Sequence, residues 1–413
     1  MSSRSNKTKE APIHPRRRLY RLFEQISDNY DQLSNVEIRY EGLEDDECTK
    51  LGLALSNNEF VEILDLTSNE ISESGSSQII RGLQHDTSHL SSLNLSSNSI
   101  GLEGATAIGN LLRINTALRT LNLHECNIGN DGLVALSIGL GSNTAIGKIV
   151  LSKNQLNDEV ALAALGRALQ TSQVSILDLS LNKFGSQGVQ SLDLHRNSSI
   201  RTILLWGNEI SISGGLFMAD ALSSPYSQIC NLNLRNNRIG DFGAESIAFG
   251  LEHNTSLRKI WLSSNLIGDE GAIHLARAIR GHSLQSIYLS NCSVGDDGAK
   301  AFAELLCDPA TQLQVLDLYR NHIGDLGGNA LSKAMRQNVS IQDLNIASNR
   351  IHNLMALRQV RFLCKCNLAG RYLLRKVDLP TGLWPRVLAK VNFKADVRFF
   401  LLREKPDLLI RHT

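Results

Sequence analysis

Proline and aromatic residues are scarce in this chain: seven of the 413 residues are proline, and Phe, Trp and Tyr together account for 5%. Aliphatic side chains therefore have to supply the core, which is typical of a regular, repetitive fold. Long apolar runs are also missing. No segment approaches the roughly 18 consecutive apolar residues of a membrane helix, and the N-terminal region has no apolar stretch of signal-peptide length. We expect a cytoplasmic protein without membrane insertion.

Cysteine pairs and enzyme motifs are missing too. The seven cysteines are odd in number and form no CxxC pair, so neither a disulfide framework nor a zinc site is indicated. The sequence contains no GxxxxGK[ST], HExxH or GxSxG motif. We therefore predict a protein that is not an enzyme, with no catalytic, cofactor-binding or metal-binding residues, no cofactor and no small-molecule substrate.

The net charge of +1 conceals a basic segment at each end of an acidic body. Residues 1–21 carry seven Lys or Arg against one Glu, and residues 352–413 carry thirteen basic against four acidic side chains. We interpret residues 1–18 as a disordered basic leader and residues 352–413 as a basic helical C-terminal cap. A solvated face of the cap helices explains the basic tail, and contact with nucleic acid, with acidic lipid or with the acidic body itself is left open. The run from Arg16 to Arg18 leaves a nuclear fraction open in the same way.

An eight-residue phrase, LxLxxNxI, recurs along the middle of the chain. It occurs as LDLTSNEI, LNLSSNSI, LDLSLNKF, LNLRNNRI and IWLSSNLI, and its eleven copies recur at a mean interval of 28 residues. A weaker copy, VEIRYEGL, precedes them and makes twelve units. After the strand the chain turns inward, and an asparagine side chain can satisfy the backbone groups of that turn. Cysteine fills the slot at Cys126 and Cys292, where we expect small packing residues rather than metal ligands.

Each unit continues into a helix. In GDEGAIHLARAI a glycine turn and two acidic residues precede apolar positions at Ala272, Leu275, Ala276 and Ile279, the spacing of a helix with one buried stripe. The acidic residues suit the positive N-terminal end of that helix. Parallel strands lie about 4.8 Å apart, whereas packed helices need roughly 8–10 Å, so the stack has to bend with its strands inside. The predicted fold is an α/β solenoid shaped as a horseshoe, with a parallel β-sheet on the concave face and helices on the convex face.

The 28-residue unit, in which LxLxxNxI is followed by GxxGA and a helix, resembles the ribonuclease-inhibitor-like class of leucine-rich repeat proteins. NOD-like receptors and Ran GTPase-activating protein have similar repeats. The resemblance implies a leucine-rich repeat solenoid of about twelve repeats over residues 36–351, and residues 19–35 have the pattern of an N-terminal helical cap. It identifies a scaffold without naming its ligand.

Large side chains gather where the strands of units six to ten face the concave side. In LxLxx the leucines enter the core, and the residues between and after them face the solvent. Most of these positions are small and polar in the first five units. The later units place Trp, Tyr and Arg there, the residue types most enriched among interface hot spots. We predict a protein-binding surface formed by Leu204, Trp206, Arg235, Trp261, Tyr288, Tyr319 and Arg320.

The leading functional hypothesis is therefore a non-enzymatic scaffold that captures a partner protein on its concave sheet. The alternative is a GTPase-activating protein of the Ran GTPase-activating type, which the resemblance alone implies. That family has a strongly acidic segment after its repeats, whereas the tail of this chain is basic. Acceleration of GTP hydrolysis by a Ran-type GTPase would favour the alternative.

Overall fold

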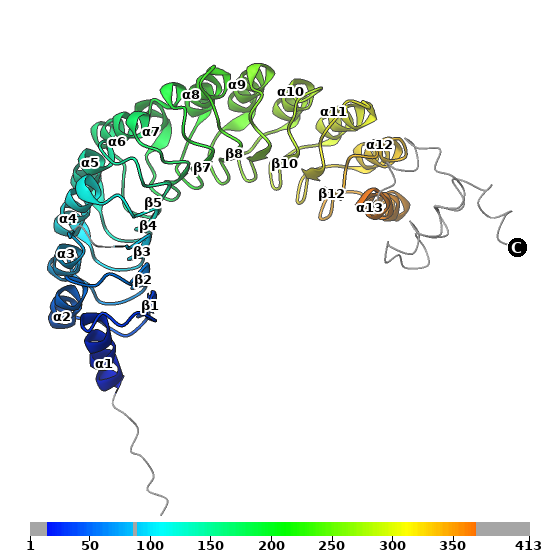
Figure 1. The fold of residues 1–413 in the computed structure, drawn as a ribbon. Helices are drawn as coiled ribbons and strands as arrows, with labels where there is room; N and C mark the ends of the chain where they lie inside the picture. The colour runs from blue at the N-terminus through cyan, green and yellow to red at the C-terminus, as the bar shows by residue number, and fades with distance from the viewer. Residues whose placement is uncertain (1–14, 86–88, 369–413) are drawn as a thin grey trace, which may run out of the picture. The chain divides into compact units, whose positions relative to one another are not determined.

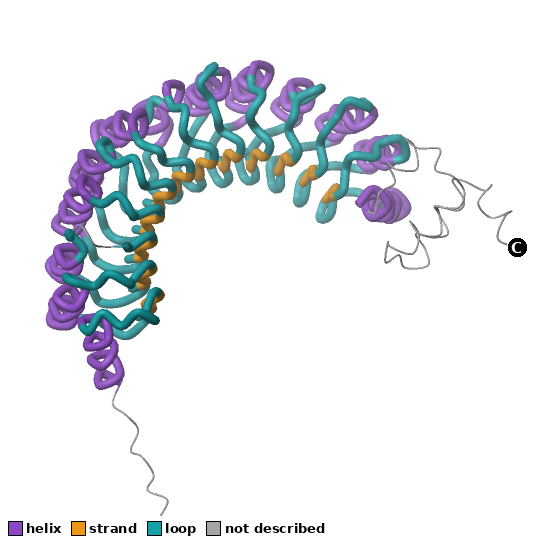
Figure 2. The backbone as a smooth tube through the Cα atoms, viewed as in Figure 1, coloured by secondary structure: helices purple, strands orange, loops and turns teal. Residues whose placement is uncertain are grey.

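A computed structural model describes residues 15–85 and 89–368 of the chain. The chain divides into two compact units, residues 1–182 and residues 183–413. Short strands alternate with helices in both units (Figure 1). Within each unit the strands line the inner side of the curve, and the helices cover its outer side (Figure 2). The predicted α/β solenoid, built from parallel strands and covering helices, is confirmed.

In its described residues the first unit has six strands and six helices. The strands pair in parallel and in chain order, so that Leu64 lies between Val36 and Leu93. The elements in chain order are α1 (Pro15–Ser27), β1 (Asn35–Glu37), α2 (Asp45–Leu55), β2 (Ile63–Asp65), α3 (Glu73–Gly82), β3 (Ser92–Asn94), α4 (Gly101–Ile114), β4 (Thr120–Asn122), α5 (Gly129–Leu140), β5 (Lys148–Val150), α6 (Glu159–Thr171) and β6 (Ile176–Asp178).

The described part of the second unit repeats the same arrangement. Its strands are also parallel and follow chain order, and Tyr288 lies in register between Trp261 and Asp317. The elements in chain order are α7 (Gly185–Ser191), the 3-10 helix η1 (Leu194–Arg196), β7 (Thr202–Leu204), α8 (Ile212–Ser223), β8 (Asn231–Asn233), α9 (Gly240–His253), β9 (Lys259–Trp261), α10 (Asp269–Ala278), β10 (Ser286–Tyr288), α11 (Asp296–Cys307), β11 (Val315–Asp317), α12 (Asp325–Met335), β12 (Asp343–Asn345) and α13 (Leu354–Leu368).

The core lies between the strands and the helices of each repeat. Ile260 and Leu262 of the β9 repeat are completely buried, as the two-residue alternation predicts. The four apolar positions predicted for the following helical segment, Ala272, Leu275, Ala276 and Ile279, are buried as well. Aliphatic side chains thus fill the core, and one side of each strand is left for the inner face.

The asparagine that follows most of the strands binds the backbone of two repeats, as the repeat pattern predicts. Asn98 illustrates the arrangement. Its Oδ1 atom accepts hydrogen bonds from the N–H groups of Asn69 (3.1 Å) and Ile71 (3.3 Å) in the preceding repeat. Its Nδ2 atom donates to the carbonyls of Leu66 (2.9 Å) and Leu95 (2.8 Å). Because these backbone groups are buried, the amide replaces the water that they lose on folding.

Two acidic residues at helix starts accept hydrogen bonds from the backbone of the next repeat. The carboxylate of Asp269 accepts hydrogen bonds from Gly295 N (2.8 Å) and Gly298 N (2.7 Å), at the beginning of α11. Asp296 binds Gly324 N and Gly327 N of the following repeat at 2.8 and 2.7 Å. We predict these acids as partners of their own helix N-terminus, but the hydrogen bonds of Asp269 and Asp296 link one repeat to the next. The carboxylates bind at a helix start because the first N–H groups of a helix have no hydrogen-bond partner within it.

A second series of asparagines, which the sequence pattern does not single out, sits in six of the turns that lead back to a strand. We call Asn58, Asn115, Asn143, Asn197, Asn254 and Asn338 the turn asparagines. Each uses Oδ1 to accept the N–H of the residue three positions later, at 2.7–2.8 Å. Each precedes the first residue of the next strand by five positions. These side chains set the length and direction of the turn.

The ends of the repeats differ in part from the expectation. Helix α1 begins at Pro15, so residues 15–18 are helical and do not belong to a disordered leader. Of the predicted C-terminal cap, helix α13 is described, and residues 369–413 lie outside the described residues, as do residues 1–14. The remaining domain boundaries stay a prediction. Helix α7 has only seven residues, which agrees with the shortened interval between Asn182 and Asn208.

Candidate functional site

The second unit carries all seven predicted surface residues on or next to its strands. Leu204, Trp261 and Tyr288 are the last residues of β7, β9 and β10. The others follow their strands: Trp206 after β7, Arg235 after β8, and Tyr319 with Arg320 after β11. Leu204, Trp206, Trp261 and Tyr288 are half-buried, whereas Arg235, Tyr319 and Arg320 are exposed. We call these seven residues the aromatic face; none of them is sealed in the core.

Trp261 and Tyr288 form the centre of the aromatic face. They are register partners on the adjacent strands β9 and β10. Their ring centroids are 5.3 Å apart and the ring planes differ by 7°, so the rings are stacked. Parallel strands hold equivalent side chains at about 4.8 Å, which is close to the spacing of stacked rings. The two side chains therefore cover each other on one side, and both are half-buried.

The remaining members of the aromatic face lie on or after the neighbouring strands β7, β8 and β11. Asn233 lies in register between Leu204 and Trp261, so that Leu204 is two strands from the tryptophan. Trp206 and Arg235 follow adjacent strands, and Gly207 N donates to Arg235 O at 3.1 Å. Trp261 and Tyr288 are thus the pair that the structure brings into direct contact, and the other five residues surround them.

The backbone after each strand has a left-handed conformation that the sequence analysis missed. In all twelve described repeats, the residue just before the asparagine position of the LxLxxNxI phrase has φ between 53° and 68°. Only Gly207 is a glycine, the residue type that adopts this conformation without steric cost. Arg320 is one of the others, with φ of 53°. The Arg320 side chain is exposed at this turn.

Asp317 is a site residue that the prediction leaves out. It is the register partner of Tyr288, and its carboxylate accepts hydrogen bonds from Ser290 Oγ and from Tyr319 N, the latter at 3.0 Å. It places a carboxylate next to Tyr288 in the row of strand-end residues. The signal for it was present, because Asp317 occupies the same strand position as Trp261 and Tyr288. A search for aromatic and arginine residues alone passes over it.

The inner face of the first unit is polar, and Arg39 and Asp65 on it are already paired. Arg39 lies 2.8 Å from the carboxylate of Asp65, which also accepts hydrogen bonds from Thr67 N and Asn94 Nδ2, both at 3.0 Å. Although burial raises the pKa of Asp65, the hydrogen bonds from Thr67, Arg39 and Asn94 outweigh it and hold the pKa below its ordinary value. These groups are satisfied within the chain.

The cysteines in the asparagine slots are packing residues. Cys126 Sγ donates to Leu95 O at 3.1 Å, and Cys292 Sγ donates to Leu262 O at 3.3 Å, the bond that Asn Nδ2 makes elsewhere. Burial raises the pKa of Cys126 to about 12 and that of Cys292 to about 11. Such thiols stay protonated at neutral pH and are poor nucleophiles and metal ligands. Within residues 15–85 and 89–368, no three His, Cys, Asp or Glu side chains are grouped as a metal site requires.

None of the helices in the described ranges is both long and apolar enough to cross a membrane.

Comparison with known proteins agrees with the repeat geometry. The family model described as Leucine Rich repeat matches residues 57–77, 88–109, 115–137, 174–192, 231–248, 253–276, 282–303 and 311–332. The NACHT, LRR and PYD domains-containing protein 12 of Homo sapiens is 25% identical over 251 residues, which cover 60% of this chain and 21% of that protein. The ribonuclease inhibitor of Sus scrofa is 25% identical over 254 residues, which cover 60% of this chain and 49% of the inhibitor. The matched part is thus about a fifth to a half of these relatives.

A solved structure shows the same fold. An internalin from Listeria monocytogenes superposes with a TM-score of 0.50 at 17% identity, covering 84% of this chain and 91% of the internalin. Parallel strands in repeat register, the strand-end asparagines and the matched family model agree with one another. The chain therefore contains leucine-rich repeats that are similar to those of the ribonuclease inhibitor.

Proposed function

We propose that this chain is a non-enzymatic scaffold that binds a partner protein through the aromatic face of its second unit. The observation that carries the proposal is the stacked pair of Trp261 and Tyr288, with ring centroids 5.3 Å apart on adjacent strands of the inner side. Neither ring is needed to fill the core, because Ile260, Leu262 and Ile287 already fill it from the other side of the strands. A large ring pair held outside the core is the arrangement expected of a contact surface.

The stack favours binding because its geometry is fixed before a partner arrives. Trp and Tyr have few rotatable bonds, and stacking on each other restricts them further, so little conformational entropy remains to be lost on association. Trp, Tyr and Arg are also the residue types that dominate interface hot spots. Arg235 and Arg320 are exposed beside the rings and can pair with carboxylates of the partner.

The relatives support a protein as the ligand. One of them is, by its name, an inhibitor of a ribonuclease, and a ribonuclease is itself a protein. The inner strands offer a wide surface with two arginines and one carboxylate, which suits a folded partner better than a small molecule. We extend the proposal to a cytoplasmic protein that has no small-molecule substrate, does not insert into membranes and uses no nucleic acid in this contact.

The proposal is tested by capturing the partner with the full chain and then measuring its dissociation constant with purified proteins. The W261A/Y288A variant removes both rings. Truncation of interface hot spots costs about 2–4 kcal/mol, so the dissociation constant is expected to rise by roughly 30-fold or more.

The matched control changes the same strand position in the first unit. The N122A/V150A variant alters the last residues of β4 and β5 and is expected to bind the partner as the unmodified chain does. Circular dichroism of both variants checks that the repeats remain folded. If the partner binds W261A/Y288A with unchanged affinity, the aromatic face is not the binding surface.

A further inference from the structure

The outer side of the second unit carries an apolar seam where α8 and α9 pack together (Figure 1). The two helices approach closely. A Cβ atom added at Gly215 would lie 2.7 Å from Gly243 Cα, and one added at Gly250 would lie 2.7 Å from Ala219 Cα. Four large apolar side chains that are 50–68% exposed flank this contact: Ile212, Leu216, Phe242 and Phe249. We call these four residues the outer seam.

The rings of the outer seam stand where neighbouring helices carry charged side chains. Phe242 and Phe249 follow the asparagine position of their repeat by five and twelve residues. In the next two repeats the same positions hold four exposed charged residues: Glu270, Arg277, Asp297 and Glu304. A helix that only covers a core carries polar side chains on its outer side. The two rings therefore depart from the pattern of the adjoining repeats, as is expected of a contact surface.

Ile212 stands where later repeats have an acid that binds the next repeat. Asp241 Oδ1 accepts the N–H of Gly271 at 2.8 Å, and Asp269 and Asp296 bind the next repeat in the same way. Each of these acids follows the asparagine position of its repeat by four residues, as Ile212 does. An isoleucine side chain accepts no hydrogen bond, and this one is half exposed and adds little to the core. The repeat thus gives up a linking contact here and presents an apolar side chain to the solvent.

Acidic side chains border the outer seam. Helices α8 and α9 contain no Lys or Arg, and their exposed acids are Asp220, Glu245 and Glu252. Each acid lies three or four positions from a residue of the outer seam, which places it on the same side of its helix. Among the described residues, Glu245 lies 3.7 Å from His274, and no Lys or Arg forms an ion pair with any of the three acids. The outer seam is therefore an apolar strip with a negative border.

We propose that the outer seam binds an amphipathic helix with a basic polar side, supplied by a partner protein. Like charges that meet across an interface are unfavourable, so the acidic border disfavours a second copy of this face and the anionic surface of a membrane. A basic helix places Lys or Arg opposite the carboxylates and its apolar side on the rings. Phe242 and Phe249 are two turns apart on α9, about 10 Å, which matches anchors at positions i and i+7 of a docked helix. This surface is separate from the proposed binding function, because it lies on the outer helices and not on the inner strands.

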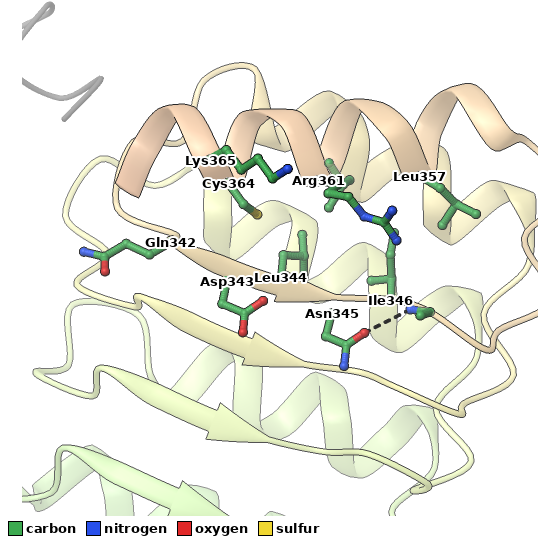
Figure 3. Close-up of a pocket in the computed structure, with 11 residues that line it drawn as sticks. Gln342, Asp343, Leu344, Asn345, Ile346, Leu357, Arg361, Cys364 and Lys365 are labelled. Carbon is green, nitrogen blue, oxygen red and sulfur yellow. Dashed lines mark hydrogen bonds between the residues drawn. The ribbon is translucent and has the colours of Figure 1, made fainter. Parts of the chain in front are cut away.

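A groove between β12 and α13 shows why charge decides the site. It has a volume of about 290 Å³, and its apolar lining includes Leu357 and Val360 of α13. Figure 3 shows Arg361 and Lys365 on the helix beside this groove, and Asp343 on the strand. Two cations against one carboxylate oppose the approach of a basic helix. Although both places are apolar, we therefore expect the basic helix at the outer seam and not at this groove.

Peptide binding to the full chain tests the proposal. The probe is a labelled synthetic helix of about 18 Leu and Lys residues with Leu at the i, i+3, i+4 and i+7 spacing, and the control probe has Glu in place of Lys. We expect fluorescence anisotropy to give a dissociation constant at least about tenfold lower for the Lys probe. The F242S/F249S variant should raise the dissociation constant of the Lys probe at least about tenfold. The matched control L102S/V160S removes exposed apolar side chains from α4 and α6 of the first unit and should leave it unchanged.

A second variant keeps the rings and removes the charges. D220N/E245Q/E252Q should weaken binding of the Lys probe about fivefold and make it less sensitive to salt. W261A/Y288A should bind the Lys probe as the unmodified chain does, which separates the outer seam from the aromatic face. Equal affinity for the two probes, unchanged binding by either seam variant, or weaker binding by W261A/Y288A would overturn the proposal.

Two further measurements report on other occupants of the outer seam. Analytical ultracentrifugation shows whether the unmodified chain forms a dimer, and flotation with phosphatidylserine vesicles shows whether it binds an anionic membrane. We expect neither behaviour to depend on Phe242 and Phe249. A dimer or vesicle binding that F242S/F249S abolishes would assign the outer seam to a second copy or to a membrane and overturn the proposed helix. Circular dichroism confirms that each variant is folded before it is compared.

Discussion

Replacing Asn98 with alanine measures how much a strand-end asparagine contributes to the solenoid. The N98A change removes an acceptor of two N–H groups, from Asn69 and Ile71, and a donor to the carbonyls of Leu66 and Leu95. Asn98 is 6% exposed, so water cannot fully replace these bonds. The site lies in the first unit and does not belong to the aromatic face.

The expected loss is dominated by the two N–H groups. A buried polar group left without a partner costs about 1–3 kcal/mol, which gives about 2–6 kcal/mol for two. The carbonyl of Leu95 keeps a second donor, the thiol of Cys126 at 3.1 Å, and adds little. Entry of a water molecule into the space left by the amide keeps the cost in the lower half of the range. We expect N98A to lower the free energy of unfolding by about 3 kcal/mol.

Because a cysteine occupies the equivalent position at Cys126, the loss of stability in N98C can be compared with that in N98A. In N98C the thiol can donate as Cys126 does but accepts poorly, so the two N–H groups stay poorly paired and we expect most of the loss seen in N98A. Urea unfolding followed by circular dichroism measures both, compared at unchanged slope. S99A, at an exposed neighbouring position, is the control and should stay within about 0.5 kcal/mol of the unmodified chain. A loss below about 1 kcal/mol in N98A would refute the reasoning.

Two further predictions concern the protonation of His282 and the hydrogen bonds that Asp296 makes to the next repeat. Burial lowers the pKa of His282, whose ring takes a hydrogen bond from Leu284 N (2.9 Å) and lies 2.6 Å from Asn254 O, so the neutral ring is the folded form. Its stabilisation is fully present above the unfolded pKa of about 6.5 and is lost as the pH falls toward the lower folded value. The stability difference between the unmodified chain and H282A should therefore shrink between about pH 7.5 and 5.5, and a constant difference would contradict this. For the carboxylate that links repeats, D296A should cost about 1–2 kcal/mol by removing two bonds to the start of α12, whereas D297A, whose exposed carboxylate pairs with a lysine, should cost less than about 0.5 kcal/mol. Urea unfolding compares the two, and equal losses would contradict the linking role of Asp296.

The repeat and the placement of the aromatic face follow from the sequence because each depends on short-range periodicity. Side chains alternate along a strand, so the burial of Ile260 and Leu262 and the partial exposure of Trp261 are fixed by one register. Once consecutive repeats share that register, Trp261 and Tyr288 have to be neighbours. Their stacking was therefore predictable as proximity, although the 7° angle between the rings was not.

Contacts between repeats were harder to predict because they depend on distances in three dimensions. The carboxylate of Asp269 binds residues 26 and 29 positions later, and nothing in the local sequence shows that it prefers them to its own helix. The turn asparagines recur with the repeat, but Ser172, Ser227, His282 and Thr311 interrupt the series. These four residues precede their strands by four positions instead of five. Because both the residue type and the spacing change, the repeat of the turn asparagines is hard to recognise in the sequence.

The start of the first helix also lay beyond the sequence pattern. Arg16 donates to Gly42 O at 3.0 Å and lies 3.5 Å from the carboxylate of Glu47. These contacts extend α1 back to Pro15, whereas the basic composition alone suggests a leader. Proline at the first position of a helix is consistent with this start, because its missing N–H would have no partner there.

Radical footprinting of the full chain, alone and with its captured partner, tests the central claim most directly. The side chains of Trp261 and Tyr288 should become protected from oxidation when the partner is bound. Tyr40, which is 76% exposed on the first unit, should keep its rate. Protection of Tyr40 together with unchanged oxidation of Trp261 and Tyr288 would contradict the assignment of the aromatic face as the binding surface.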